Sequence, residues 1–226
     1  GGGVAVSSGC KFIMNSGAVI RNCTARDGGG VDISKWNDLH GEFTLNGGSI
    51  LACKATAESF QNSGGGGVYN GGKFIMKSGT IEGCTSPSQR DGDKSSGVYN
   101  GSMFTICGGT IGSNVTNIAT LYADGGSIAG NVTNGTGGGP GKIAGNNGAT
   151  SETSFEGSVT NNSNGTIEKG NFTGQVTNNG TIIGGTFYGA VSGTGMVEDS
   201  ATHTVSFDAN GGSTVAAQKI LRGQKA

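Results

Sequence analysis

Several features are scarce in this sequence, and each scarcity excludes a class of protein. Proline supplies 2 of the 226 residues and charged residues only 13%, so neither a collagen-like chain nor a charge-expanded disordered chain is expected. No apolar run approaches the roughly 18 residues of a spanning helix, so no membrane insertion is predicted. The formal net charge is −1 without a Lys/Arg cluster, which predicts no nucleic-acid partner and no acidic membrane surface.

Other absences concern targeting, metals and cofactors. The chain opens on Gly1 without a charged-then-apolar leader, so we expect an excised piece of a longer protein whose targeting signals lie outside it. Five cysteines are an odd number for a disulfide framework, and no CxxC pair accompanies the 2 histidines. The sequence therefore predicts no metal site and no cofactor.

What the sequence has is glycine and a repeat. Glycine supplies 48 residues, and a chain this rich in glycine needs a regular hydrogen-bond ladder and an apolar interior to offset its conformational entropy. Residues 66–84 hold one copy of a motif whose phenylalanine recurs at spacings of 31, 31 and 30 residues. The four phenylalanines are Phe12, Phe43, Phe74 and Phe104. Such a period indicates stacked units, none of which can bury its apolar face alone.

Each copy favours three short strands, near residues 68–69, 74–76 and 80–81, where β-branched and aromatic residues alternate with polar ones. No segment has a convincing helical period, residues 54–60 being the nearest. A chain that returns every 30 or so residues, without room for crossover helices, is best explained as an all-β parallel β-helix. We expect all four phenylalanines to share one interior row.

From about residue 109 the repeat shortens to 15–17 residues, marked by Phe155, Phe172 and Phe187, each followed by x-Gly-x-Val. We therefore divide the chain into a solenoid of residues 1–200, with long turns over 1–108 and short turns over 109–200, and a different C-terminal segment of residues 201–226. The shortening predicts a solenoid that narrows to about half its perimeter. In all, nine or ten turns are expected.

Asparagines and cysteines also recur at the turn spacing. Stacked asparagines at corners, in the left-handed conformation, would bond copy to copy; the pairs are Asn161 with Asn178 and Asn114 with Asn131. The alternative is glycosylation, because acceptor motifs begin at Asn114, Asn131, Asn134, Asn164 and Asn171. Cys23, Cys53 and Cys84 occupy one place in consecutive turns, where Asn114 takes over in the fourth. This favours an inward stack of thiols over a metal site.

The C-terminal segment departs from the short period. A strand at 204–207, a turn at 208–212 and a second strand predict a β-hairpin. Residues 204–212, TVSFDANGG, resemble the opening of the internalin-B-type B repeat, also called the Listeria–Bacteroides repeat; the match covers about 24 residues. The resemblance implies a small β-module of large exported bacterial proteins, where it acts as a stalk or adhesion element. Less specifically, the upstream repeats resemble Gly-rich β-helical regions of adhesin-like surface proteins and the wider pectate-lyase-like superfamily.

Two places offer a candidate ligand surface. Trp36, the sole tryptophan, stands beside Asn37, Asp38 and His40 in an insertion, where its ring could stack on a sugar while the polar neighbours take hydroxyls. The alternative is that Trp36 folds over the sheet edge and His40 caps a strand. Tyr69 and Tyr99 recur at the turn spacing and predict an outward or corner ladder that could contribute to a binding face.

Catalysis is the less favoured reading. Polysaccharide lyases and hydrolases on β-helices need clustered carboxylates on adjacent turns, whereas Asp27, Asp32 and Asp38 are scattered within one turn. A lone Asp91-Gly92-Asp93 has too few oxygens for calcium. The sequence therefore favours a non-catalytic protein of the bacterial cell surface, a rigid spacer or adhesin whose partner is a glycan or another surface protein. A carbohydrate-active β-helix enzyme, or its binding module, is the alternative.

Overall fold

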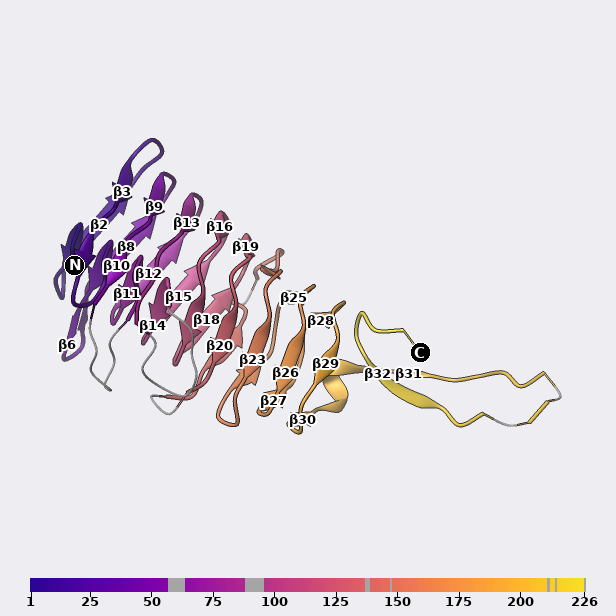
Figure 1. Ribbon diagram of the computed structural model, residues 1–226. Helices are drawn as coiled ribbons and strands as arrows, with labels where there is room; N and C mark the ends of the chain where they lie inside the picture. Colours follow the sequence, from indigo (N-terminus) through magenta and orange to yellow (C-terminus); the bar gives the residue numbers. More distant parts are fainter. Residues whose placement is uncertain are drawn as a thin grey trace.

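The computed structural model describes residues 1–56, 64–87, 96–136, 139–146, 148–210, 212–213 and 215–225. Over these residues the chain is an all-β parallel β-helix, as the repeat predicts. It winds through three parallel sheets that form the sides of one rod, and Figure 1 shows the rod narrowing away from the N-terminus. No helix in this part of the chain is long and apolar enough to cross a membrane.

Each sheet collects one strand per turn, with every neighbouring pair parallel. The first sheet contains β1 (Val4–Val6), β5 (Val31–Ile33), β11 (Val68–Asn70), β14 (Val98–Asn100), β17 (Val115–Asn117), β20 (Val132–Asn134), β23 (Val159–Asn161), β26 (Val176–Asn178) and β29 (Val191–Ser192). The second contains β2 (Lys11–Met14), β8 (Glu42–Leu45), β12 (Lys73–Met76), β15 (Met103–Ile106), β18 (Thr120–Ala123), β21 (Lys142–Ala144), β24 (Thr166–Ile167), β27 (Thr181–Ile182) and β30 (Met196–Val197). The third contains β3 (Val19–Arg21), β9 (Ser49–Leu51), β13 (Thr80–Glu82), β16 (Thr110–Ile111), β19 (Ser127–Ile128), β22 (Ser154–Phe155), β25 (Asn171–Phe172) and β28 (Thr186–Phe187).

Smaller elements complete the described chain. The pair β4 (Thr24–Ala25) and β10 (Lys54–Ala55) is parallel. Two pairs are antiparallel: β6 (Lys35–Trp36) with β7 (Leu39–His40), and β31 (Thr202–Val205) with β32 (Gln218–Leu221). A single 3-10 turn, η1 (Asp199–Ala201), stands between the last solenoid strand and β31.

Seven phenylalanines of the described chain form two interior rows. The four N-terminal phenylalanines are in register on the second sheet, as predicted, with ring centroids 4.5 to 5.6 Å apart. Phe155, Phe172 and Phe187 instead continue the isoleucine row of the third sheet, with centroids 4.7 and 4.8 Å apart. All but Phe12, which lies in the first turn, are fully buried. Because buried Phe contributes the most apolar area per residue, these rows carry much of the core.

A ladder of six buried asparagines runs along the corner where the first sheet turns into the second. Each side-chain amide donates to the amide oxygen of the next asparagine at 2.7 Å, from Asn70 through Asn100, Asn117, Asn134, Asn161 and Asn178. The same nitrogens donate to backbone carbonyls where the second sheet begins, such as that of Thr166. The predicted stacking of Asn161 on Asn178 is therefore confirmed.

Two details of the asparagine prediction are corrected. The ladder residues end β-strands, and none has the positive φ expected at a corner. Asn114 and Asn131 do not join amide to amide; the Asn114 side chain accepts a hydrogen bond from the backbone of Asn131 at 3.0 Å. Glycosylation of Asn134 would require removal of a fully buried side chain from the ladder, whereas Asn131 and Asn164 are exposed.

The cysteine column lies inside the rod, as predicted. Cys53 and Cys84 are buried and Cys23, in the first turn, is half-buried, all as free thiols. The fourth turn continues the column with buried Ser113 rather than Asn114, because the Ser113 hydroxyl accepts the Cys84 backbone N–H at 3.0 Å. Burial raises the pKa of Cys84 from its ordinary value of 9.0 to about 11 and also raises that of Cys53. Buried neutral thiols of this kind behave as small apolar side chains.

The short turns keep all three sheets, so the predicted loss of half the perimeter falls mainly on loops. Residues 52–67 and 83–97 link the third sheet to the first in the long turns, whereas residues 112–114 do so where the short turns begin. Strands of the second sheet also shorten, from four residues in β12 to two in β24. The rod therefore narrows without losing a side.

The C-terminal hairpin projects beyond the rod in Figure 1. Its paired strands lie nearer its base than predicted, over 202–205 and 218–221. The predicted turn persists locally, because Gly212 N donates to the Ala209 carbonyl at 2.7 Å. Buried Ala201 and half-buried Leu221 hold the base of the hairpin against the solenoid core, which explains why pairing begins there.

Candidate functional site

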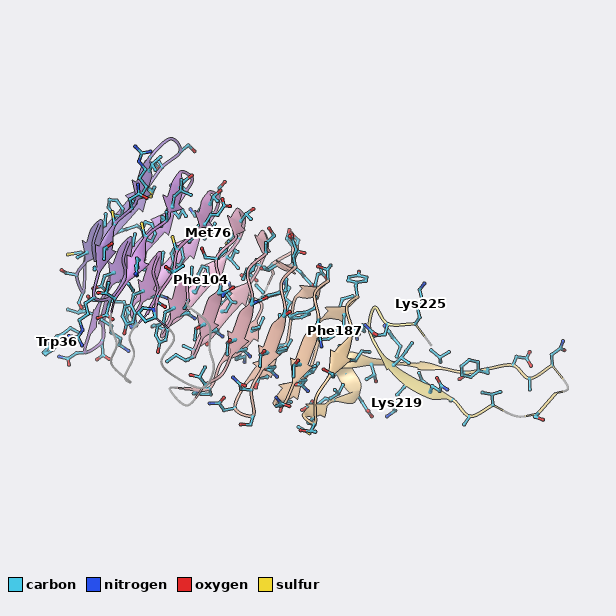
Figure 2. All side chains as sticks on the ribbon, in the orientation of Figure 1. Trp36, Met76, Phe104, Phe187, Lys219 and Lys225 are labelled. Carbon is cyan, nitrogen blue, oxygen red and sulfur yellow. The ribbon has the colours of Figure 1, made fainter. Side chains whose placement is uncertain are left out.

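The insertion that holds Trp36 folds as a two-residue β-hairpin. Trp36 pairs with Leu39 and Lys35 with His40, and Asn37 takes the positive φ of 52° that the turn requires. The hairpin base is closed by a hydrogen bond from Gly41 N to the Ser34 carbonyl at 2.8 Å. Figure 2 shows Trp36 projecting from the N-terminal end of the rod.

Trp36 is 72% exposed and Leu39 60% exposed. The tryptophan therefore does not fold over the sheet edge, and the alternative interpretation of this residue is wrong. His40 does receive a hydrogen bond, but through its backbone carbonyl, from Gly9 N at 3.1 Å.

Strand geometry decides which neighbours share a face with the indole ring. Residues directly opposite each other in an antiparallel pair project to the same side, and successive residues project to opposite sides. Leu39 therefore accompanies Trp36, while His40 lies with Lys35 on the other face. Sequence reasoning missed Leu39, because only the strand pairing shows that it stands opposite the tryptophan.

Tyr69 and Tyr99 form an outward pair on the first sheet, as predicted. Their rings stack with centroids 5.3 Å apart and planes 3° apart, between inward neighbours that are fully buried, such as Val68 and Asn70. Tyr99 is only 8% exposed, so the pair offers a ligand mainly the half-buried Tyr69. Burial raises the pKa of Tyr69, and the charges of Asp27 and Asp32 raise it further.

Two carboxylates border this tyrosine pair. Asp32 is the register partner of Tyr69 on the neighbouring strand. Burial raises the pKa of Asp27; Arg26, 3.7 Å away, opposes this effect and Asp32 adds to it. One oxygen of Asp27, Oδ1, is buried without a hydrogen-bond partner. Sequence reasoning had treated these aspartates as scattered, because their proximity depends on the fold.

The tryptophan hairpin and the tyrosine pair lie at neighbouring positions. A side chain added at Gly71 would meet the Tyr69 ring edge at 3.5 Å and the backbone nitrogen of Lys35 at 4.0 Å. The hairpin base thus adjoins the tyrosines, and Asn37 and Asp38 stand in its exposed turn. We call Trp36, Leu39 and Tyr69 the aromatic corner.

The Asp91-Gly92-Asp93 loop, where the sequence disfavours calcium binding, lies outside the described residues. Within the described ranges, no group of three or more His, Cys, Asp or Glu side chains is arranged to hold a metal ion. Comparison of the chain with protein-family models, with curated proteins and with solved structures finds no match.

Proposed function

We propose that this chain is part of an exported, non-catalytic protein of the bacterial cell surface: a rigid spacer that presents the aromatic corner to a glycan. The supporting observation is the exposed Trp36–Leu39 pair at the end of a regular rod. An indole ring held in water by two short strands supplies an apolar face for the C–H side of a sugar ring, and Asn37 and Asp38 can bond its hydroxyls. The resemblance of residues 204–212 to an exported repeat supports the location.

A glycan-array screen of the full chain against Trp36→Ala tests this proposal. We expect binding to at least one glycan family and loss of most of that signal in the variant. Tyr188→Ala is the matched control, because Tyr188 is also an exposed aromatic residue, at 62%, but lies among the short turns. Equal binding by both variants would remove Trp36 from the site, and binding to no glycan would leave the spacer role with another surface protein as partner.

A carbohydrate-active enzyme is the second candidate, and one observation favours it. Glu152 and Glu168, from adjacent turns, line the same pocket, as a pair of catalytic carboxylates would. However, Glu168 is paired with Lys142 at 2.7 Å, and the pocket has none of the apolar lining that keeps a general acid protonated. We therefore assign ligand binding rather than catalysis to this pocket. Release of reducing sugar from a polysaccharide, abolished in Glu152→Gln, would reverse this choice.

A further inference from the structure

A pocket of about 380 Å³ opens at the corner between the second and third sheets. Consecutive turns supply most of it, and the C-terminal segment supplies Arg222. The lining residues are Gly145, Asn146, Glu152, Glu168, Lys169, Gly184, Gly185, Thr186 and Arg222. Its volume is near the lower end of the roughly 300–1,000 Å³ of small-molecule sites.

Two of the four charged side chains in the pocket are already paired. Glu168 forms an ion pair with Lys142 at 2.7 Å. Lys169 lies 3.8 Å from Asp124 and donates to the Ala149 carbonyl at 3.4 Å. Glu152 and Arg222 are different: within the described chain, no hydrogen bond or ion pair involves either side chain. The pocket therefore offers a ligand one unpaired carboxylate and one unpaired guanidinium.

Backbone contacts fix Arg222 at the rim. Its carbonyl accepts the Phe187 N–H at 2.6 Å, and its own N–H donates to the Ala201 carbonyl at 3.1 Å. Two residues on, the Gln224 side chain donates to the carbonyls of Phe187 and Gly189 at 2.8 and 2.7 Å. The chain after β32 thus lies against β28, the last strand of the third sheet, and the guanidinium lines the pocket because the hairpin docks there.

The lining selects the class of ligand. It contains glycine and polar or charged side chains only, so an apolar or aromatic ligand finds no surface to bury. A hydroxyl-rich ligand suits it, because carboxylates, an amide and a hydroxyl all bond hydroxyl groups. The planar fork of Arg222 matches a carboxylate through two parallel hydrogen bonds.

We propose that this pocket binds a sugar unit that carries a carboxylate, of the hexuronic acid class. Arg222 holds the carboxylate, Lys169 adds positive charge beside it, and Glu152 accepts ring hydroxyls. The site is separate from the aromatic corner, and it deepens the proposed role in glycan recognition by naming an acidic sugar.

Isothermal titration of the full chain with glucuronate, galacturonate, glucose and L-alanine tests this assignment. We expect both uronates to bind about 10- to 100-fold more tightly than glucose, which is the effect of one charge-assisted contact. Arg222→Ala should lose a similar factor, Arg222→Lys less, and Glu152→Gln several-fold. Lys219→Ala is the matched control, because Lys219 lies in the same hairpin and pairs with Asp199 at 2.7 Å.

Each of these results would overturn the proposal: equal affinity for glucose and the uronates, tighter binding of L-alanine, or unchanged uronate binding in Arg222→Ala with a native circular dichroism spectrum. No binding of uronate at tens of millimolar would also overturn it. Trp36→Ala should leave uronate binding unchanged, so failure of this site and failure of the aromatic corner are distinguishable.

Discussion

The long turns and the short turns, which the structure divides after β16 at Ile111, wind through the same three sheets but fill the interior differently. In the long turns a phenylalanine of the second sheet faces an isoleucine of the third, as with Phe74 and Ile81. In the later short turns the order is reversed, as with Ile167 and Phe172. The comparison teaches that either sheet can supply the large ring of a turn. The turn between the two arrangements has no ring, because Leu121 and Ile128 fill its interior.

The first prediction tests whether the two phenylalanine rows are equivalent. Phe74→Ala and Phe172→Ala should each lower the free energy of unfolding by about 3–5 kcal/mol, because each leaves a cavity in a filled row. Chemical denaturation monitored by circular dichroism measures the change. Phe207→Ala, in the exposed part of the hairpin, is the control and should cost less than about 0.5 kcal/mol. A small effect of Phe172→Ala alone would mean that the short turns are loosely packed.

The second prediction concerns the asparagine ladder, which crosses both regions. Asn134→Leu should lower the free energy of unfolding by about 2–4 kcal/mol. The substitution removes the acceptor of the Asn117 amide nitrogen and the donor to the Asn161 amide oxygen, and both atoms stay buried. Asn131→Leu, three residues earlier and exposed, should cost less than about 1 kcal/mol. Equal costs for the two variants would contradict a buried ladder.

The third prediction concerns the cysteine column of the long turns. Cys84 has a pKa of about 11 in the folded protein, above its ordinary value of 9.0, so only the unfolded chain loses the proton between these values. Stability should therefore be complete below pH 9 and fall by roughly 2–3 kcal/mol as the pH rises through 11. Denaturation at pH 8 and 10.5 measures the fall, and Cys84→Ala should reduce it. An undiminished fall in Cys84→Ala would assign it to other groups.

The smallest expected effect is at a corner of the long turns. Asn22, Ala52 and Gly83 stand at one position of consecutive turns with φ of 55°, 50° and 63°. The alanine is the costly residue there, because glycine has no Cβ and asparagine tolerates the left-handed region through local hydrogen bonds of its side chain. Ala52→Gly should raise the free energy of unfolding, measured by chemical denaturation, by about 1 kcal/mol. Gly83→Ala should lower it by a similar amount. Destabilisation by Ala52→Gly, or stabilisation by Gly83→Ala, would contradict the positive φ at these positions.

The period of the sequence was enough to predict the sheets and their register. Phe12, Phe43, Phe74 and Phe104 could be aligned without coordinates, because each sits in the same short motif. The transfer of the ring to the third sheet at Phe155 could not be predicted, since Phe-x-Gly-x-Val is compatible with either strand.

The candidate ligand sites were less accessible to sequence reasoning than the fold. The partner of Trp36 depends on strand pairing across a turn, which put Leu39 rather than His40 beside the ring. The pocket depends on longer separations: Glu152 and Arg222 are 70 residues apart and line one pocket only because the chain after the hairpin packs against β28. No local motif marks either residue.

The asparagine ladder also gives the rod a sense of direction. Every amide donates toward the C-terminal end, the first oxygen accepts the backbone N–H of Gly72, and the last nitrogen donates to the carbonyl of Met196. Backbone groups satisfy both ends of this chain of dipoles. A complete turn can therefore be inserted or deleted between two asparagines without leaving a buried polar group unpaired. Length is thus adjustable in whole turns, by duplication of a segment as short as Val176 to Ala190.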